Sequence, residues 1–193
     1  TSCSFSPPSM MVFTAAGDLI TLYVGLELMT MSFIVLIGIV RRNALSSEAA
    51  IKYLVLSGLS SAVMLYGISL IYGFMGTTVL LEMSMNIYAF SHTAFMVVGV
   101  LFFLAGFAYK LSAVPFHMWA PDIYQGAPTP VAGFLALGEV ATLGVLCRLL
   151  FNYFNYYGDS WLDVILALAM LSIIFGNLVA IPQRDIKRML AYS

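Results

Sequence analysis

Long apolar runs separated by short polar stretches run along this sequence of 193 residues. A helix of about 20 apolar residues matches the hydrocarbon core of a bilayer. The runs predict membrane-crossing helices at about residues 11–40, 53–74, 93–125, 131–151 and 161–181, with a further helix starting at 184–193. Strict apolar/polar alternation is absent, so an all-α membrane protein is expected rather than a β-barrel. We expect residues 1–193 to form a single membrane domain.

The third of these segments is predicted to be a broken helix. Its apolar character continues through Pro115, and a proline inside a helix removes a hydrogen bond and clashes with the preceding turn. The stretch PFHMWAPDIYQGAPTP then adds three more prolines and a glycine. We expect a helix, a break near 112–115 and a second short helix. Broken helices at membrane depth are typical of ion and substrate paths in transporters.

Basic residues in the short loops predict the orientation. One end of the predicted bundle carries Arg41, Arg42, Lys52, Arg184, Lys187 and Arg188. The other end has Arg148. We expect the first end to face the mitochondrial matrix or the bacterial cytoplasm. Lys52 and Arg148 are interpreted as topology anchors.

Composition agrees with a lipid environment and excludes several functions. Hydrophobic residues make up 62% and charged residues 9% of the chain, whereas soluble domains carry roughly 25% charged residues. A net charge of −1 without a basic stripe excludes nucleic-acid binding. The two cysteines and two histidines show no metal-binding spacing. We expect no cofactor and no metal in this chain, so redox chemistry would belong to partner subunits.

Three ionisable residues lie inside apolar runs: Glu27, Lys110 and Glu139. An unpaired charge in hydrocarbon costs at least about 2.5–3.5 kcal/mol, so such residues face a bundle interior, a partner or a water-filled path. Burial favours the neutral form of each group, and a nearby opposite charge favours the ionised form. A Glu27–Lys110 pair could therefore switch a proton. A structural ion pair, or a lysine that reaches the membrane surface, would explain the same residues.

His117 follows the predicted break, where a side chain that titrates near neutral pH could pass a proton between its two ring nitrogens. It could equally satisfy backbone groups freed by the break. Asp122 follows Pro121 and is expected to cap or pin the second short helix.

The sequence from Lys110, KLSAVPFHMWAPDIYQGAPTP, resembles the broken-helix signature of the antiporter-like subunits of respiratory complex I, NADH:quinone oxidoreductase. VPFHMWAPD followed by YQGAPTP is most similar to subunit 2, called subunit N in bacteria. DLITLYVGLELM resembles the glutamate helix of that family, SSEAAIKYLVLSGLSSAVMLYGISLIYG its next helix, and GNLVAIPQRDIKRMLAYS a later loop. The resemblance covers nearly the whole chain.

The resemblance implies a role for each matching residue. Glu27 matches the acidic partner, Lys110 the central proton-carrying lysine, and His117 the histidine that leads onward from it. It also implies an inverted-repeat fold, of which this chain holds most of the first repeat and the start of the second. In the family a second lysine stands on the next helix, and counting from His117 that position is Val140 here. Glu139 is its neighbour, so the onward relay is either altered or uses Glu139.

The implied function is proton translocation in the membrane arm of NADH:ubiquinone oxidoreductase, with flavin, iron–sulfur clusters and quinone in partner subunits. Other membrane-arm subunits and the lipid bilayer are the expected partners. Two alternatives stay open: an Mrp-type cation/proton antiporter subunit, or a structural membrane-arm fragment that no longer pumps. Because the sequence opens at Thr1 and lacks the family's later helices, we expect a separate chain to supply them. A mitochondrial inner membrane is preferred, with a bacterial plasma membrane as the alternative.

Overall fold

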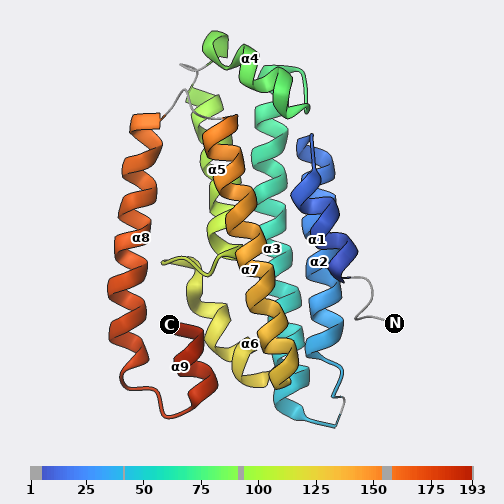
Figure 1. Ribbon diagram of the computed structural model, residues 1–193, viewed down its shortest axis with the longest axis vertical. Coiled ribbons are helices and arrows are strands. Elements are labelled where there is room, and N and C mark those ends of the chain that lie inside the picture. Colours follow the sequence, from blue (N-terminus) through green and yellow to red (C-terminus); the bar gives the residue numbers. More distant parts are fainter. Residues whose placement is uncertain (1–5, 41, 91–93, 154–157, 193) are drawn as a thin grey trace.

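A computed structural model describes residues 6–40, 42–90, 94–153 and 158–192 as a helical bundle (Figure 1). Arg41 and residue 93, which opens the third predicted segment, lie outside this description. Within the described ranges, the helices long and apolar enough to cross a membrane are α2 (Leu19–Ile37), α3 (Ala44–Met75), α7 (Thr129–Asn152) and α8 (Gly158–Ala180). The shorter α5 (Ala94–Lys110) adds a further apolar helix. The expected all-α membrane fold is therefore confirmed.

The prediction of one continuous helix over 11–40 is corrected. The chain forms α1 (Ser6–Ala15), turns at residues 16–18 and then forms α2. Asp18 caps α2, because its carboxylate accepts hydrogen bonds from the backbone N–H of Thr21 at 2.8 Å and from the Thr21 hydroxyl at 2.5 Å. The Leu19 N–H also donates to the Thr78 carbonyl at 3.0 Å, which ties this turn to the turn after α3.

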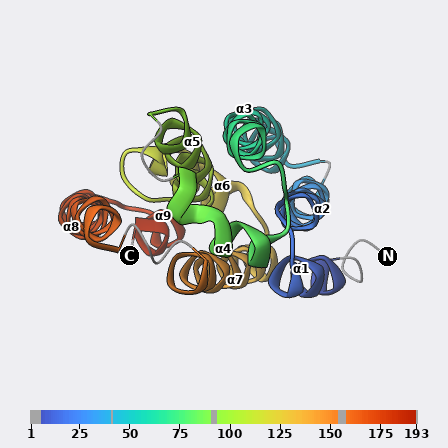
Figure 2. The same cartoon turned by 90° about the horizontal axis from the view of Figure 1, so that it is seen from above.

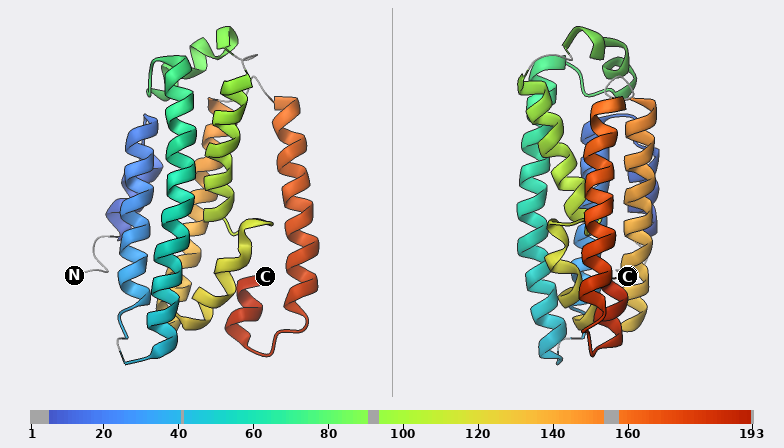
Figure 3. Two further views of the ribbon diagram at one scale, coloured as in Figure 1. Left: turned by 180° about the vertical axis from the view of Figure 1, so that it is seen from behind. Right: turned by 90° about the vertical axis from the view of Figure 1, so that its left-hand side faces the viewer.

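The predicted break is confirmed. Helix α5 ends at Lys110, the chain turns through 111–115, and the 3-10 helix η2 (Phe116–Trp119) leads into α6 (Ala120–Gly126). Ser112 takes a positive φ of 54° at this turn. Below the break α6 packs between α3 and α9 (Ile186–Tyr192), while α8 stands at one side of the bundle (Figure 3). Helix α4 (Leu80–Phe90) lies across one end, which is clear from above (Figure 2).

The described loop residues 38–40, 42–43 and 181–185 lie at the same end of the bundle, opposite α4 (Figure 1). Arg42 and Arg184 occupy these loops, and Arg148 lies toward the other end of the bundle on α7. The described basic residues are therefore distributed between the two ends of the bundle as the sequence predicts, with Arg42 and Arg184 at one end and Arg148 toward the other. That this end faces the cytoplasm or matrix stays a prediction from the positive-inside rule.

The outer surface is apolar, as a lipid environment requires. On α2, Val24, Leu28, Met31 and Val35 follow one outward stripe and are 47–56% exposed. Inside the bundle, small residues let helices approach closely: a Cβ on Gly67 of α3 would lie 2.6 Å from the Phe103 nitrogen of α5.

Gly126 sets a similarly close contact at the end of α6. A Cβ at this position would lie 2.6 Å from both the Ala49 Cβ and the Leu45 carbonyl oxygen of α3. We expect Gly126→Ala to push α6 away from α3 and to lower the free energy of unfolding by about 1–3 kcal/mol. Thermal unfolding of the purified protein checks this. Gly133→Ala on α7 is the matched control, because a Cβ there meets nothing within 4 Å; equal melting temperatures for the two variants would contradict the prediction.

Candidate functional site

The first part of the site lies on α2 and α3. Glu27 and Thr30 are three residues apart on α2, so they share one face of the helix. The Ser61 hydroxyl of α3 donates a hydrogen bond to the Glu27 carboxylate. Glu27 is half-buried, whereas Thr30 and Ser61 are buried. The carboxylate is thus held inside the bundle by a neutral donor.

Lys110 reaches this face from the last residue of α5. Its side chain is buried, at 5% exposure, and its Nζ donates to the Thr30 hydroxyl oxygen at 2.7 Å. Thr30 in turn donates to the Leu26 carbonyl at 2.8 Å. Lys110 and Glu27, both within the described chain, form no ion pair at 4.0 Å or less. The structure therefore places Lys110 against the helix face that carries Glu27. The direct hydrogen-bond partner of Lys110 is the Thr30 hydroxyl, not the Glu27 carboxylate.

Thr30 was missed by the sequence reasoning. Its spacing of three residues from Glu27 was the available signal, because that spacing places both side chains on one helix face. A threonine in an apolar helix, however, commonly bonds back to a carbonyl of the preceding turn, and Thr30 also does this.

The break that ends α5 is held by specific hydrogen bonds. The Tyr109 carbonyl accepts from the Ser112 N–H at 3.1 Å and from the Trp119 indole N–H at 2.8 Å. The Val114 N–H donates to the Ser172 hydroxyl of α8 at 3.0 Å. Side chains of the second half of the broken helix and of α8 thus replace bonds that a continuous helix would have made. This fixes Lys110 at the turn.

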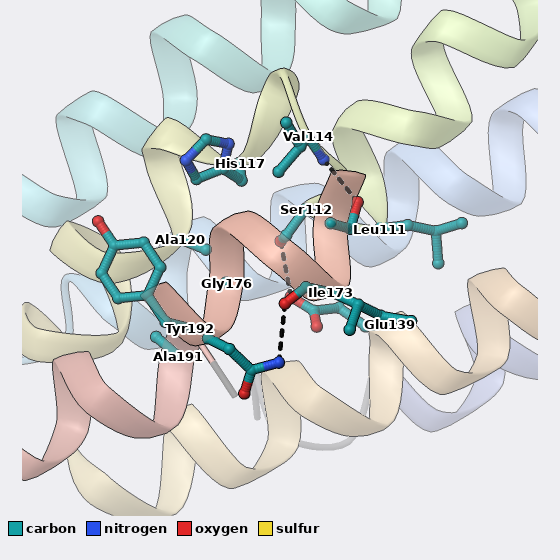
Figure 4. Close-up of a pocket in the computed structure, with 12 residues that line it drawn as sticks. Leu111, Ser112, Val114, His117, Ala120, Glu139, Ile173, Gly176, Ala191 and Tyr192 are labelled. Atoms are coloured by element: carbon teal, nitrogen blue, oxygen red, sulfur yellow. Dashed lines mark hydrogen bonds between the residues drawn. The ribbon is translucent and has the colours of Figure 1, made fainter. Parts of the chain in front are cut away.

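A cavity of about 320 Å³ opens on the other side of the break (Figure 4). Its polar lining residues are Ser112, His117, Glu139, Ser172, Asn177 and Tyr192. The Ser112 hydroxyl donates to the Glu139 carboxylate at 3.2 Å. The volume exceeds what one water molecule needs, about 30 Å³ of liquid volume, and the polar lining supplies partners for several.

His117 lies at the edge of this cavity and is 9% exposed. Its ring packs edge-on against Phe175 of α8, with ring centres 4.8 Å apart. Its Nδ1 atom is buried and has no hydrogen-bond partner within the described part of the chain. A buried ring nitrogen beside a polar cavity can exchange a proton with water there.

Glu139 and Val140 face in different directions from α7. Glu139 lines the cavity, while the Val140 side chain is 66% exposed on the outside of the bundle. Successive residues on a helix point about 100° apart, so only one of two neighbours can face a given cavity. The geometry therefore favours Glu139, not position 140, as the position from which α7 places an ionisable group at the cavity.

Asp122 pins α6 to its neighbours, as expected. Its carboxylate pairs with Lys52 of α3 at 2.9 Å and with Arg188 of α9 at 3.3 Å. Asp185 begins α9: the backbone N–H of Lys187 donates to its carboxylate at 2.8 Å and holds the pKa of Asp185 below its usual value. The two ion pairs of Asp122 fasten the short helix α6, which follows the break, to α3 and α9. The pair with Lys52 was not predicted.

The described residues include no group of three or more His, Cys, Asp or Glu side chains placed to hold a metal ion. The site holds the buried Lys110 amine, the carboxylates of Glu27 and Glu139, and the His117 imidazole. Hydroxyl groups form hydrogen bonds with the amine and with both carboxylates. Such groups can take up and release protons without a cofactor. A bundle of apolar helices with a broken helix beside a buried lysine defines an antiporter-like membrane protein.

The chain belongs to the NADH:quinone oxidoreductase/Mrp antiporter transmembrane family, whose model matches residues 16–193. It is 52% identical over 190 residues to NADH-quinone oxidoreductase subunit N of Desulforamulus reducens; the match covers 98% of this chain and 40% of that protein. The chain thus spans about two-fifths of the length of these curated relatives.

Two solved structures share the fold. A chain of respiratory complex I from Thermus thermophilus superposes with a TM-score of 0.82 at 30% identity, covering 99% of this chain and 41% of that one. A chain of the Mrp complex from Dietzia sp. DQ12-45-1b gives a TM-score of 0.87 at 23% identity, covering 99% and 36%. The second likeness is one of fold alone.

Proposed function

We propose that this chain is part of a proton-translocating membrane-arm subunit of NADH:quinone oxidoreductase, within which it forms a single membrane domain. The observation that carries the proposal is the placement of Lys110, buried at the end of a broken helix between a carboxylate face and a polar cavity. The 52% identity to a subunit N supports the choice of complex. Under this proposal the chain is a subunit of an enzyme but performs no redox chemistry itself.

Lys110 would carry the proton. Desolvation favours a neutral amine and a nearby carboxylate favours the ammonium form, so the charge state of Glu27 biases whether Lys110 holds its proton. The Thr30 hydroxyl lies against Lys110 Nζ and can accept from the ammonium form. A change of charge in a neighbouring subunit could weaken the electrostatic attraction between Glu27 and Lys110. Lys110 would then release its proton.

The cavity would take the proton onward. His117 and Glu139 both line it, and the Ser112 hydroxyl connects the break to the Glu139 carboxylate. Water in a polar cavity of this size can link side chains that do not touch. We propose His117 as the shuttle and Glu139 as the acceptor, in the role that a lysine at position 140 would otherwise fill.

Flavin, iron–sulfur clusters and quinone would then reside in partner subunits, with no cofactor in this chain. Other membrane-arm subunits and the surrounding bilayer are the proposed partners. Relatives that are 49–52% identical to this chain come from bacteria, which favours a bacterial plasma membrane; a mitochondrial inner membrane stays a prediction.

The Mrp-type alternative shares this fold, since the Dietzia Mrp chain superposes at a TM-score of 0.87. The two functions differ in the energy source and in the ion moved. Inverted membrane vesicles that carry the full-length protein test the difference. We expect NADH to drive proton uptake that needs quinone reduction and no added sodium, and that is lost when the gene is deleted. Proton movement driven by a sodium gradient and indifferent to NADH would overturn the proposal.

A further inference from the structure

Two buried hydroxyl groups bind the amine and the carboxylate of the α2 face separately. The Thr30 hydroxyl accepts from Lys110 Nζ at 2.7 Å, and the Ser61 hydroxyl of α3 donates to the Glu27 carboxylate. Thr30 and Ser61 are 1% and 4% exposed. Among the described residues, Lys110 Nζ makes no second hydrogen bond and no ion pair at 4.0 Å or less. The amine and the carboxylate therefore each have a neutral partner.

This separation matters because a direct ion pair would hold the proton on the amine. Opposite charges attract far more strongly in a low-dielectric interior than in water, and breaking a buried pair leaves an uncompensated charge. Thr30 lies three residues after Glu27 on the same face of α2 and takes the place of the carboxylate as the partner of Lys110. Lys110 can then lose its proton without the breaking of an ion pair.

A hydroxyl group also suits both charge states of the amine. It has one donor and two acceptor lone pairs, whereas an ammonium group only donates and a neutral amine gains a lone pair that accepts. Thr30 accepts from Lys110 and donates to the Leu26 carbonyl at 2.8 Å. Beside a neutral amine, the hydroxyl hydrogen can turn from that carbonyl to the amine lone pair. The Leu26 carbonyl keeps a partner, because the α-helical pattern also pairs it with the Thr30 N–H.

Thr142 of α7 shows what a buried threonine does without such a partner. It is also 1% exposed, and its hydroxyl donates to the Gly138 carbonyl of the preceding turn at 2.8 Å. Within the described part of the chain, it receives no hydrogen bond from another helix. The two threonines thus share burial and the bond back to their own helix. They differ in the contact with Lys110.

We propose that Thr30 is a positioning residue of the proton relay, whose hydroxyl serves Lys110 in both charge states. It holds Lys110 Nζ apart from Glu27, accepts from the ammonium form and donates to the amine. The proton leaves Lys110 by the route of the proposed function, on which this inference rests. Thr30 neither gains nor loses a proton, because its hydroxyl hydrogen only changes acceptor. Lys110 therefore keeps its place on the α2 face when its charge changes.

The test is Thr30→Val in the full-length subunit within its membrane complex. Valine keeps the branched shape and removes the hydroxyl, so we expect proton translocation for each assembled complex to fall on the order of tenfold, as for the loss of one hydrogen bond to a charged group. Thr30→Ser should recover at least about half of the native rate, because serine carries the same hydroxyl. Thr142→Val is the matched control and should stay near the native rate.

A second readout separates this role from a structural one. Adding Thr30→Val to Lys110→Met should not slow the residual NADH-driven quinone reduction further, because Thr30 acts through Lys110; a purely structural loss would add to the first. Subunit content and melting temperature are measured for every variant.

The role of Thr30 is overturned if Thr30→Val translocates as fast as Thr142→Val, or if Thr30→Ser is as slow as Thr30→Val. In either case, loss of translocation in Lys110→Met leaves the proposed function standing. If Lys110→Met itself translocates at the native rate, the proposed function fails together with the role of Thr30.

Discussion

Lys110→Met is expected to abolish proton translocation and to slow NADH-driven quinone reduction on the order of 10²-fold, since a positioned proton-transfer group contributes about 10²–10⁴-fold to a rate. Methionine keeps most of the side-chain length and removes the amine. The variant therefore leaves the packing around Thr30 close to native while removing the group that carries the proton. Proton uptake and NADH oxidation by inverted vesicles measure both effects.

The control for this variant is Lys52→Met. Lys52 also lies on a helix of the bundle, but its side chain is 42% exposed and pairs with Glu48 and Asp122. Exposed ion pairs contribute about 0–1 kcal/mol, so this change should leave translocation near the native rate. If the two lysine variants behave alike, with translocation intact, the chain is a structural component and not a proton relay.

Glu139→Gln is expected to have the second-largest effect. Glutamine keeps the size of the side chain and its hydrogen bond with Ser112 but cannot bind and release a proton near neutral pH. We expect translocation to fall at least about tenfold while the complex stays assembled. The measurement is the number of protons moved for each NADH oxidised.

The outward orientation of Val140 on α7 allows a second test of the assignment to Glu139. Val140 is 66% exposed on the outside of the bundle, so a lysine placed there would point away from the cavity. Adding Val140→Lys to Glu139→Gln should therefore fail to restore translocation. Recovery of the native rate by the added lysine would show that position 140 reaches the proton path, and that the assignment to Glu139 is wrong.

The broken helix and its charged neighbours were predictable because they depend on local chemistry. Pro115 cannot continue a helix, and Lys110 and Glu139 are conspicuous in apolar runs. Which face of α7 turns inward depends on packing against other helices, so sequence alone left Glu139 and position 140 both open. The same holds for Thr30, whose importance appears only when the end of α5 meets α2.

The turn between α1 and α2 was missed for a different reason. Hydropathy averaged over about 20 residues does not register the short turn at residues 16–18, because apolar residues flank it. Length held a signal, since a helix of 30 residues would be about 45 Å long and exceed the hydrocarbon core of about 30 Å. Asp18 at the start of the second helix was a further signal, as aspartate is a preferred cap.

The most direct test of the central claim is mass spectrometry of the intact membrane complex that the full-length protein purifies with. We expect flavin-binding and iron–sulfur subunits, together with other antiporter-like membrane subunits, in fixed stoichiometry with this protein. That result would place the Lys110 relay in NADH:quinone oxidoreductase. A complex that contains antiporter-like subunits alone, with no redox subunit, would contradict the account and assign the site to cation/proton exchange.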